Sequence, residues 1–130
     1  MIGLDTSTII DLFKGDDNVI SFLNNTREQV STTVINIFEL YIGLDLINPI
    51  HQEEEVYYLE LLENMPNFSL DIRSCRHASK ILWNLKKQGK IINRWDCAIA
   101  AIFMDNGVDK ILTKNKKHFE NIKGLKVLSY

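Results

Sequence analysis

The sequence is poor in the residues that hold small secreted or fibrous proteins together. Its 130 residues include two cysteines, two prolines and six glycines. Cys75 and Cys97 form no CxxC pair, which argues against a zinc site or a disulfide framework and favours a reducing compartment. No repeat and no Pro/Gly/Ser-rich linker interrupts the chain. We therefore expect a single domain spanning residues 1–130.

Long hydrophobic runs are also missing. No stretch of about 18 uncharged apolar residues is present, so we expect no membrane-spanning helix. The first residues, MIGLDTSTIIDL, have no basic region and place Asp5 inside the apolar run, unlike a signal peptide. These features favour a cytoplasmic protein that does not associate with a membrane.

A strong excess of one charge is absent from the whole chain, but its two parts differ. The formal net charge is −2. Residues 1–72 hold two basic and thirteen acidic residues, whereas residues 73–130 hold thirteen basic and four acidic ones. Such an asymmetry indicates a polyanion or a metal ion as a partner.

Short apolar runs alternate with amphipathic segments along the chain. The short runs predict strands at residues 2–5, 29–32, 68–70, 110–113 and 126–129. The longer segments predict helices over residues 8–14, 19–25, 33–46, 50–65, 71–88, 93–106 and 116–122. This alternation predicts an α/β fold with a parallel sheet of about five strands. The functional crevice of such a sheet lies beyond the carboxyl ends of its strands.

Two of the predicted helices carry apolar residues at helical spacing, which is typical of a face that packs on a core. In the helix over 33–46 these residues are Ile35, Phe38, Ile42 and Leu46. In the helix over 50–65 they are Val56, Leu59, Leu62 and Met65.

Three acidic residues stand at or near the expected crevice. Asp5 ends the first strand, where it can also cap the following helix. Glu39 borders the apolar face of its helix, and the alternative is an ordinary solvent-facing glutamate. Asp96 opens the otherwise almost wholly apolar helix WDCAIAAIFM, where it also suits the helix dipole.

Carboxylates forced together raise one another's pKa values unless a cation neutralises them. Ligation by oxygen alone favours Mg²⁺ or Mn²⁺ over zinc, and such an ion can activate water for phosphodiester cleavage.

Another polar segment, LTKNKKHF, follows the fourth predicted strand. Thr113 and Asn115 can hydrogen-bond a carboxylate or a water molecule, or simply organise a turn. A basic cluster follows at the same edge and is alternatively just a solvated surface; it contains Lys114, Lys116, Lys117 and His118.

Four blocks together carry a resemblance to a known family. They are LDTSTIIDLFKG (4–15), INIFELYIGL (35–44), DCAIAAIFMDNG (96–107) and ILTKNKKHFENIKGLKVL (111–128). In this order the chain resembles PIN-domain ribonucleases, in particular the VapC toxins of type II toxin–antitoxin modules. The resemblance implies an α/β/α sandwich and an endoribonuclease that depends on Mg²⁺ or Mn²⁺.

The same resemblance assigns roles to individual residues. It places Asp5, Glu39 and Asp96 as catalytic metal ligands, and Asn115 at a fourth catalytic position that is often aspartate in PIN domains. Thr6 and Thr113 match hydroxyl positions that flank the metal site. Arg94 stands where some relatives have a further acid. For RNA binding we expect four basic residues, Arg94, Lys114, Lys116 and Lys117.

The expected partners follow from the resemblance as well. A structured RNA such as a tRNA or an rRNA loop is the expected substrate, and cleavage leaves 5′-phosphate and 3′-hydroxyl ends. A homodimer and a VapB-like antitoxin are the expected protein partners. The stretch QEEEVYYLELLENM (52–65), with Tyr57, Tyr58, Leu61 and Leu62, can supply part of either interface, or be an ordinary amphipathic helix.

Two other functions stay open at this point. A receiver-type phospho-acceptor domain would use Asp71 at the end of the third strand, with Thr113 and a nearby lysine. This hypothesis gives Glu39 and Asp96 no role. The second is a PIN fold that has lost catalysis and only binds, which Asn115 and Arg94 keep open.

Overall fold

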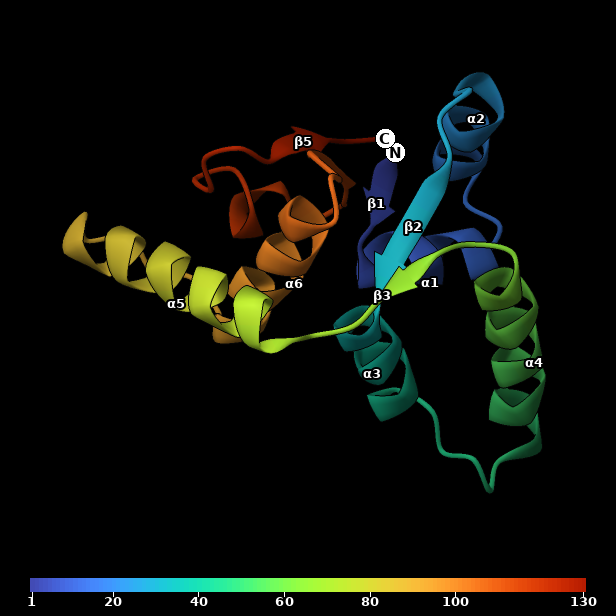
Figure 1. Cartoon of the computed structure of the whole chain (residues 1–130). Helices are drawn as coiled ribbons and strands as arrows, with labels where there is room; N and C mark the ends of the chain where they lie inside the picture. Colours follow the sequence, from blue (N-terminus) through green and yellow to red (C-terminus); the bar gives the residue numbers. More distant parts are fainter.

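The computed structural model describes all 130 residues and arranges five strands in one parallel sheet. The strand order is β3–β2–β1–β4–β5, and every neighbouring pair is parallel. The strands are β1 (Ile2–Leu4), β2 (Val30–Thr33), β3 (Asn67–Phe68), β4 (Lys110–Leu112) and β5 (Lys126–Leu128). The predicted α/β class and the five-stranded parallel sheet are confirmed (Figure 1).

Six α-helices connect these strands. They are α1 (Thr6–Phe13), α2 (Asp17–Asn25), α3 (Val34–Ile42), α4 (Pro49–Glu63), α5 (Ile72–Lys87) and α6 (Arg94–Asp105). The prediction of a helix over 116–122 is wrong except for one 3₁₀ turn, Lys116–His118. The chain after this turn is irregular because Phe119, Ile122 and Leu125 all pack into the core, and all three are buried. No helix in the structure is long and apolar enough to cross a membrane.

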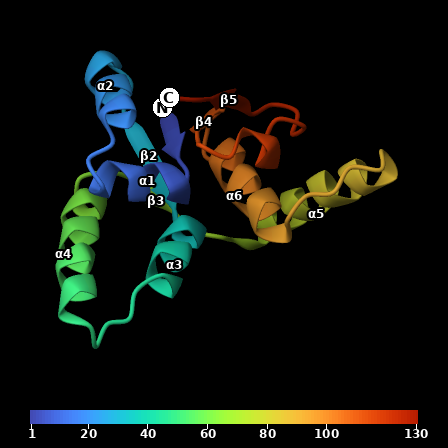
Figure 2. The same cartoon turned by 180° about the vertical axis from the view of Figure 1, so that it is seen from behind.

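Helices cover both faces of the sheet, as expected for an α/β/α sandwich. Ile2 and Leu4 pack on the side of α1, α2 and α4, while α5 and α6 lie on the opposite side (Figures 1 and 2). Gly3, between them, faces α6. A Cβ atom at Gly3 would lie 2.5 Å from the Phe103 ring, so only glycine allows α6 to approach β1 this closely. The chain termini lie side by side in both views.

The predicted burial of the apolar face of α3 is wrong for three of its four residues. Ile35 is buried, but Phe38 and Ile42 are 53% and 69% exposed, and Leu46 is exposed beyond the end of the helix. The helix packs through Ile35 and Leu40 into separate parts of the core, with Ile37 and Tyr41 partly buried beside Leu40. Phe38 and Ile42 lie on the other side of the helix and face solvent.

The predicted burial of the apolar face of α4 is confirmed for two of its four residues. Leu62 and Met65 are buried, whereas Val56 and Leu59 are exposed. The helix instead packs through Tyr58, whose ring contacts Phe13 of α1 with centroids 5.6 Å apart.

Candidate active site

Polar side chains from four elements line one pocket at the carboxyl-terminal edge of the sheet. Its volume is about 280 Å³. It is lined by Asp5, Thr6, Ser7, Ile10, Glu39, Asn93, Asp96, Asn115 and His118. The three acids singled out in the sequence therefore meet in space, although 34 and 57 residues separate them along the chain. Asp5 follows β1, Glu39 lies on α3 and Asp96 lies in the first turn of α6.

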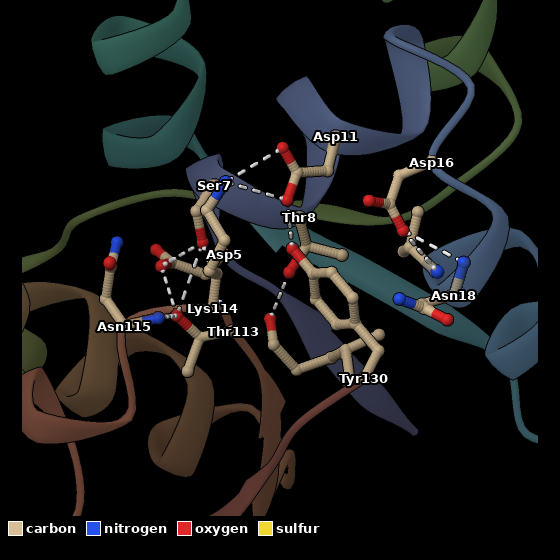
Figure 3. A network of polar contacts seen from close by, with 12 residues as sticks. Asp5, Ser7, Thr8, Asp11, Asp16, Asn18, Thr113, Lys114, Asn115 and Tyr130 are labelled. Carbon is tan, nitrogen blue, oxygen red and sulfur yellow. Dashed lines mark hydrogen bonds and ion pairs between the residues drawn. The ribbon is translucent and has the colours of Figure 1, made fainter.

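Asp5 is held by three hydrogen bonds. Ser7 Oγ and Thr113 Oγ1 donate to its Oδ2 at 3.1 and 2.6 Å, and Asn36 Nδ2 donates to its Oδ1 at 3.2 Å. The residue occupies the N-cap position of α1, but its carboxylate accepts no bond from the helix amides. The carboxylate is thus oriented by neighbours from three different elements rather than used as a helix cap. Figure 3 shows two of these neighbours, Ser7 and Thr113, beside Asp5.

Asn36 supports the acidic pocket from behind, although the sequence does not single it out. It is fully buried. Its Oδ1 accepts from Thr33 Oγ1 at 2.7 Å, and its Nδ2 also donates to Thr6 Oγ1 at 3.0 Å. Thr6 Oγ1 in turn donates to Glu39 Oε1 at 2.7 Å. One amide therefore links two carboxylates of the pocket, and its only signal in the sequence is a polar residue inside the apolar run VINIF.

Burial and mutual repulsion raise the pKa values of two acids in the pocket, Glu39 and Asp96. Burial raises the pKa of Asp96 to about 6, and the charges of Asp5 and Glu39 add to this effect, while His118 opposes it. Burial also raises the pKa of Glu39, with a further contribution from Asp5, against the hydrogen bond from Thr6. His118 Nδ1 lies 3.2 Å from Asp96 Oδ2. The sequence predicts His118 only as a member of the basic cluster, whereas the structure also places it in the acidic pocket.

These donors fit a hard divalent cation that retains water ligands. Asp5, Glu39 and Asp96 offer only oxygen, and the raised pKa values of the last two indicate a site that a cation would stabilise. No group of three or more His, Cys, Asp or Glu side chains is arranged to chelate an ion directly. Mg²⁺ usually keeps several of its waters and takes only one or two carboxylates, so bridging waters suit this geometry.

A second, basic pocket adjoins the first. It has a volume of about 430 Å³ and shares Asn115 and His118 with the acidic pocket. Its remaining lining residues are Lys114, Lys116, Lys117 and Glu120. Arg94 is exposed at the start of α6, one residue before Trp95 and two before Asp96, and lines neither pocket. Thr113 Oγ1 accepts a bond from the Asn115 backbone N–H at 3.0 Å.

The phospho-acceptor hypothesis finds no support in this arrangement. Asp71 is exposed, and its carboxylate forms a capping box with Ser74 at the start of α5. It lines neither pocket. Asp71 thus begins a helix and has no contact with Thr113.

Comparison with known proteins gives a consistent picture. The family model for the PIN domain matches residues 2–125. Over 100 residues the chain is 31% identical to Ribonuclease VapC3 of Methanocaldococcus jannaschii, covering 77% of this chain and 95% of that one.

Two solved structures extend the likeness over the whole chain. VapBC2 from Rickettsia felis, bound to a promoter DNA fragment, aligns with a TM-score of 0.85 at 19% identity, covering 100% and 99% of the two chains. VapBC-1 from nontypeable Haemophilus influenzae aligns with a TM-score of 0.81 at 26% identity, covering 99% and 98%. Together with the acidic pocket at the strand ends, these matches show that the chain belongs to the PIN-domain family and is a VapC-like member of it.

Proposed function

We propose that this VapC-like protein is an endoribonuclease that hydrolyses phosphodiester bonds in structured RNA with the help of Mg²⁺ or Mn²⁺. One observation carries the proposal. Asp5, Glu39 and Asp96 converge in a pocket that shares a wall with a basic pocket. An acidic pocket suits a cation and a basic one suits a polyanion, so a phosphate backbone can lie across both.

Each side chain has a defined task in this reaction. A bound Mg²⁺ or Mn²⁺ would supply a water of lowered pKa and stabilise charge on the phosphate. Asp5, Glu39 and Asp96 would hold it, in part through water. Ser7, Thr113 and Asn36 fix the oxygens of Asp5, and Thr6 fixes Glu39.

The remaining predicted site residues act on the RNA. Asn115 lines both pockets, where its amide can orient the attacking water or a phosphate oxygen. Lys116, Lys117 and Arg94 are exposed and form no ion pair, so they are available to phosphates. Such contacts position RNA without reading its sequence. A tRNA or an rRNA loop is the substrate class that we propose, with 5′-phosphate and 3′-hydroxyl products.

The exposed apolar side chains point to a protein partner. They cluster on α3, on α4 and on the loop that joins them, and comprise Phe38, Ile42, Leu46, Ile47, Ile50, Val56 and Leu59. Contiguous exposed apolar surface marks interaction sites. We propose that a VapB-like antitoxin and a second copy of the chain use this region. In the segment 52–65 the interface would use Val56 and Leu59, because Tyr58 and Leu62 belong to the core.

A comparison of two matched acid-to-amide variants tests the enzymatic proposal. Cleavage of tRNA and rRNA fragments is measured with Mg²⁺, with Mn²⁺ and with a chelator. We expect Asp96→Asn to lower the rate about 100-fold or more, since it removes a carboxylate from the cation site. Glu60→Gln, exposed on α4, should cleave at the wild-type rate. RNA binding by the wild type without any divalent-dependent cleavage would refute the proposal in favour of a binding module.

A further inference from the structure

Lys114 lines the basic pocket and its side chain is 60% exposed, yet its ammonium group is paired with a buried carboxylate of the protein. Its Nζ lies 3.1 Å from Oδ1 and 3.0 Å from Oδ2 of Asp11 on α1. Tyr130, just after β5, donates its hydroxyl to the same Oδ2 at 2.9 Å. Figure 3 shows the three side chains meeting beside Asp5 and Ser7. These contacts join α1, the loop after β4 and the segment after β5.

The Asp11 carboxylate depends on these two partners. Its side chain is only 8% exposed, and burial alone would raise its pKa. Hydrogen bonds from Lys114 and Tyr130 outweigh burial, and the pKa of Asp11 is lowered. A buried carboxylate that loses such a partner is left uncompensated, which is strongly destabilising. The Asp11 carboxylate is therefore ionised at neutral pH and faces the Lys114 ammonium group.

The backbone of the same loop is bonded to the acidic pocket. The Lys114 N–H donates to Ser7 Oγ at 3.2 Å, and Ser7 Oγ donates to Asp5. On either side of Lys114, Thr113 donates to Asp5 and accepts from the Asn115 N–H. A displacement of Lys114 must therefore disturb both Asp5 and Asn115.

We propose that Asp11, Lys114 and Tyr130 form a clamp that positions residues 113–118 against the acidic pocket, and that Lys114 is a positioning residue and not an RNA contact. The clamp satisfies the charge of Lys114 locally. Lys116 and Lys117 have no carboxylate partner, so phosphate binding in the basic pocket falls to them. This inference rests on the proposed ribonuclease function.

Steady-state kinetics of two opposite charge changes separate positioning from RNA binding. Lys114→Met removes a positive charge, whereas Asp11→Asn removes the counter-charge and frees the lysine. If the clamp positions the loop, both variants lower kcat about 10-fold with an unchanged KM and an unchanged salt dependence. The double variant is then no worse than either single one, because both lose the same contact.

Lys116→Met is the matched control for a lysine that binds phosphate. It should raise KM with kcat retained, and should lower the slope of log affinity against log salt by about 0.7 to 0.9. The clamp is refuted if Lys114→Met behaves like Lys116→Met while Asp11→Asn leaves RNA affinity unchanged or higher.

Hydrogen exchange tests the clamp without any RNA cleavage. In metal-free protein, Asp11→Asn and Tyr130→Phe should accelerate exchange of the Lys114 and Asn115 amides at least several-fold. The amides of α6, which lies outside the clamp, serve as the internal control for an intact fold. Unchanged exchange at Lys114 and Asn115 would overturn the clamp, whereas a wild type that cleaves no RNA would overturn only the ribonuclease function.

Discussion

Replacing Asp96 with asparagine should stabilise the metal-free protein. The carboxylate is only 12% exposed, and its pKa is raised from 3.8 to about 6 by burial, with Asp5 and Glu39 adding and His118 opposing. In a carboxyl group whose pKa is raised by folding, the charged form is disfavoured in the folded state. Above pH 6 the wild type carries the full penalty, and below about pH 4 it carries almost none.

The magnitude follows from the size of this shift. One pKa unit is about 1.4 kcal/mol, which gives an upper limit of roughly 3 kcal/mol for Asp96. The pocket opens to solvent, which screens its charges, so we expect a gain of roughly 1 to 2 kcal/mol at pH 7. For a chain of this length that corresponds to an increase in Tm of roughly 4 to 8 °C.

Thermal unfolding followed by circular dichroism, with a chelator present, measures this gain. The Asp96→Asn advantage should be largest at pH 7 and should shrink towards pH 4.5, where the wild-type carboxyl is protonated. Mg²⁺ or Mn²⁺ should raise the Tm of the wild type and have less effect on the variant, since ligands that bind the folded state stabilise it. Glu60→Gln, exposed on α4, is the control for a general change in net charge. A lower Tm for Asp96→Asn at pH 7, or an equal change at both pH values, would refute the electrostatic reasoning.

Three further changes test other parts of the structure. Gly3→Ala should cost about 1 to 3 kcal/mol in the free energy of unfolding, measured by urea denaturation, because the added Cβ meets the Phe103 ring; an unaffected midpoint would contradict the close approach of α6. Asn36→Ala should weaken divalent cation binding in isothermal titration calorimetry, because Asp5 and Glu39 lose the amide that links them; wild-type affinity would show that the link is dispensable. Ile42→Asp, at a residue that is 69% exposed, should weaken antitoxin binding or dimerisation without lowering the Tm, as followed by light scattering and pull-down; unchanged assembly would remove α3 from the interface.

Local patterns in the sequence were sufficient to predict the sheet, because they follow from periodicity alone. Strands buried on both faces are continuous apolar runs, and four of the five predicted runs match strands of the structure within one residue at each end. The run predicted over 68–70 meets β3 (Asn67–Phe68) only at Phe68. The side on which a helix packs could not be predicted in this way, because it depends on contacts with residues that are distant in sequence. In α3 the spacing of Ile35, Phe38 and Ile42 predicted a buried face, yet Phe38 and Ile42 are exposed. Leu40 reaches the core in their place, with Ile37 and Tyr41 packed partly against it. Apolar spacing does not distinguish a core from a partner-binding surface.

The acids of the pocket could be predicted for the same local reason. Asp5 and Asp96 interrupt apolar segments at element ends. Burial of a carboxylate there is costly unless hydrogen bonds, an opposite charge or a metal ion compensate for the lost solvation. The side chains that orient them gave no comparable signal. Ser7 and Asn36 are ordinary polar residues in the sequence, and their roles arise from partners brought together by the fold, such as Asn36 and Asp5, which are 31 residues apart.

The unequal distribution of charge along the chain shows how far composition alone can mislead. Residues 73–130 carry thirteen basic and four acidic residues, which suggests that many lysines are available to RNA. Two of them instead pair with acids of the other half, Lys114 with Asp11 and Lys110 with Glu28. Lys110 begins β4 and Lys114 follows its end, so the two ion pairs tie both ends of this interior strand to segments that precede α3. A lysine contributes to an RNA surface only when no carboxylate already neutralises it, and in the basic pocket Lys116 and Lys117 meet that condition.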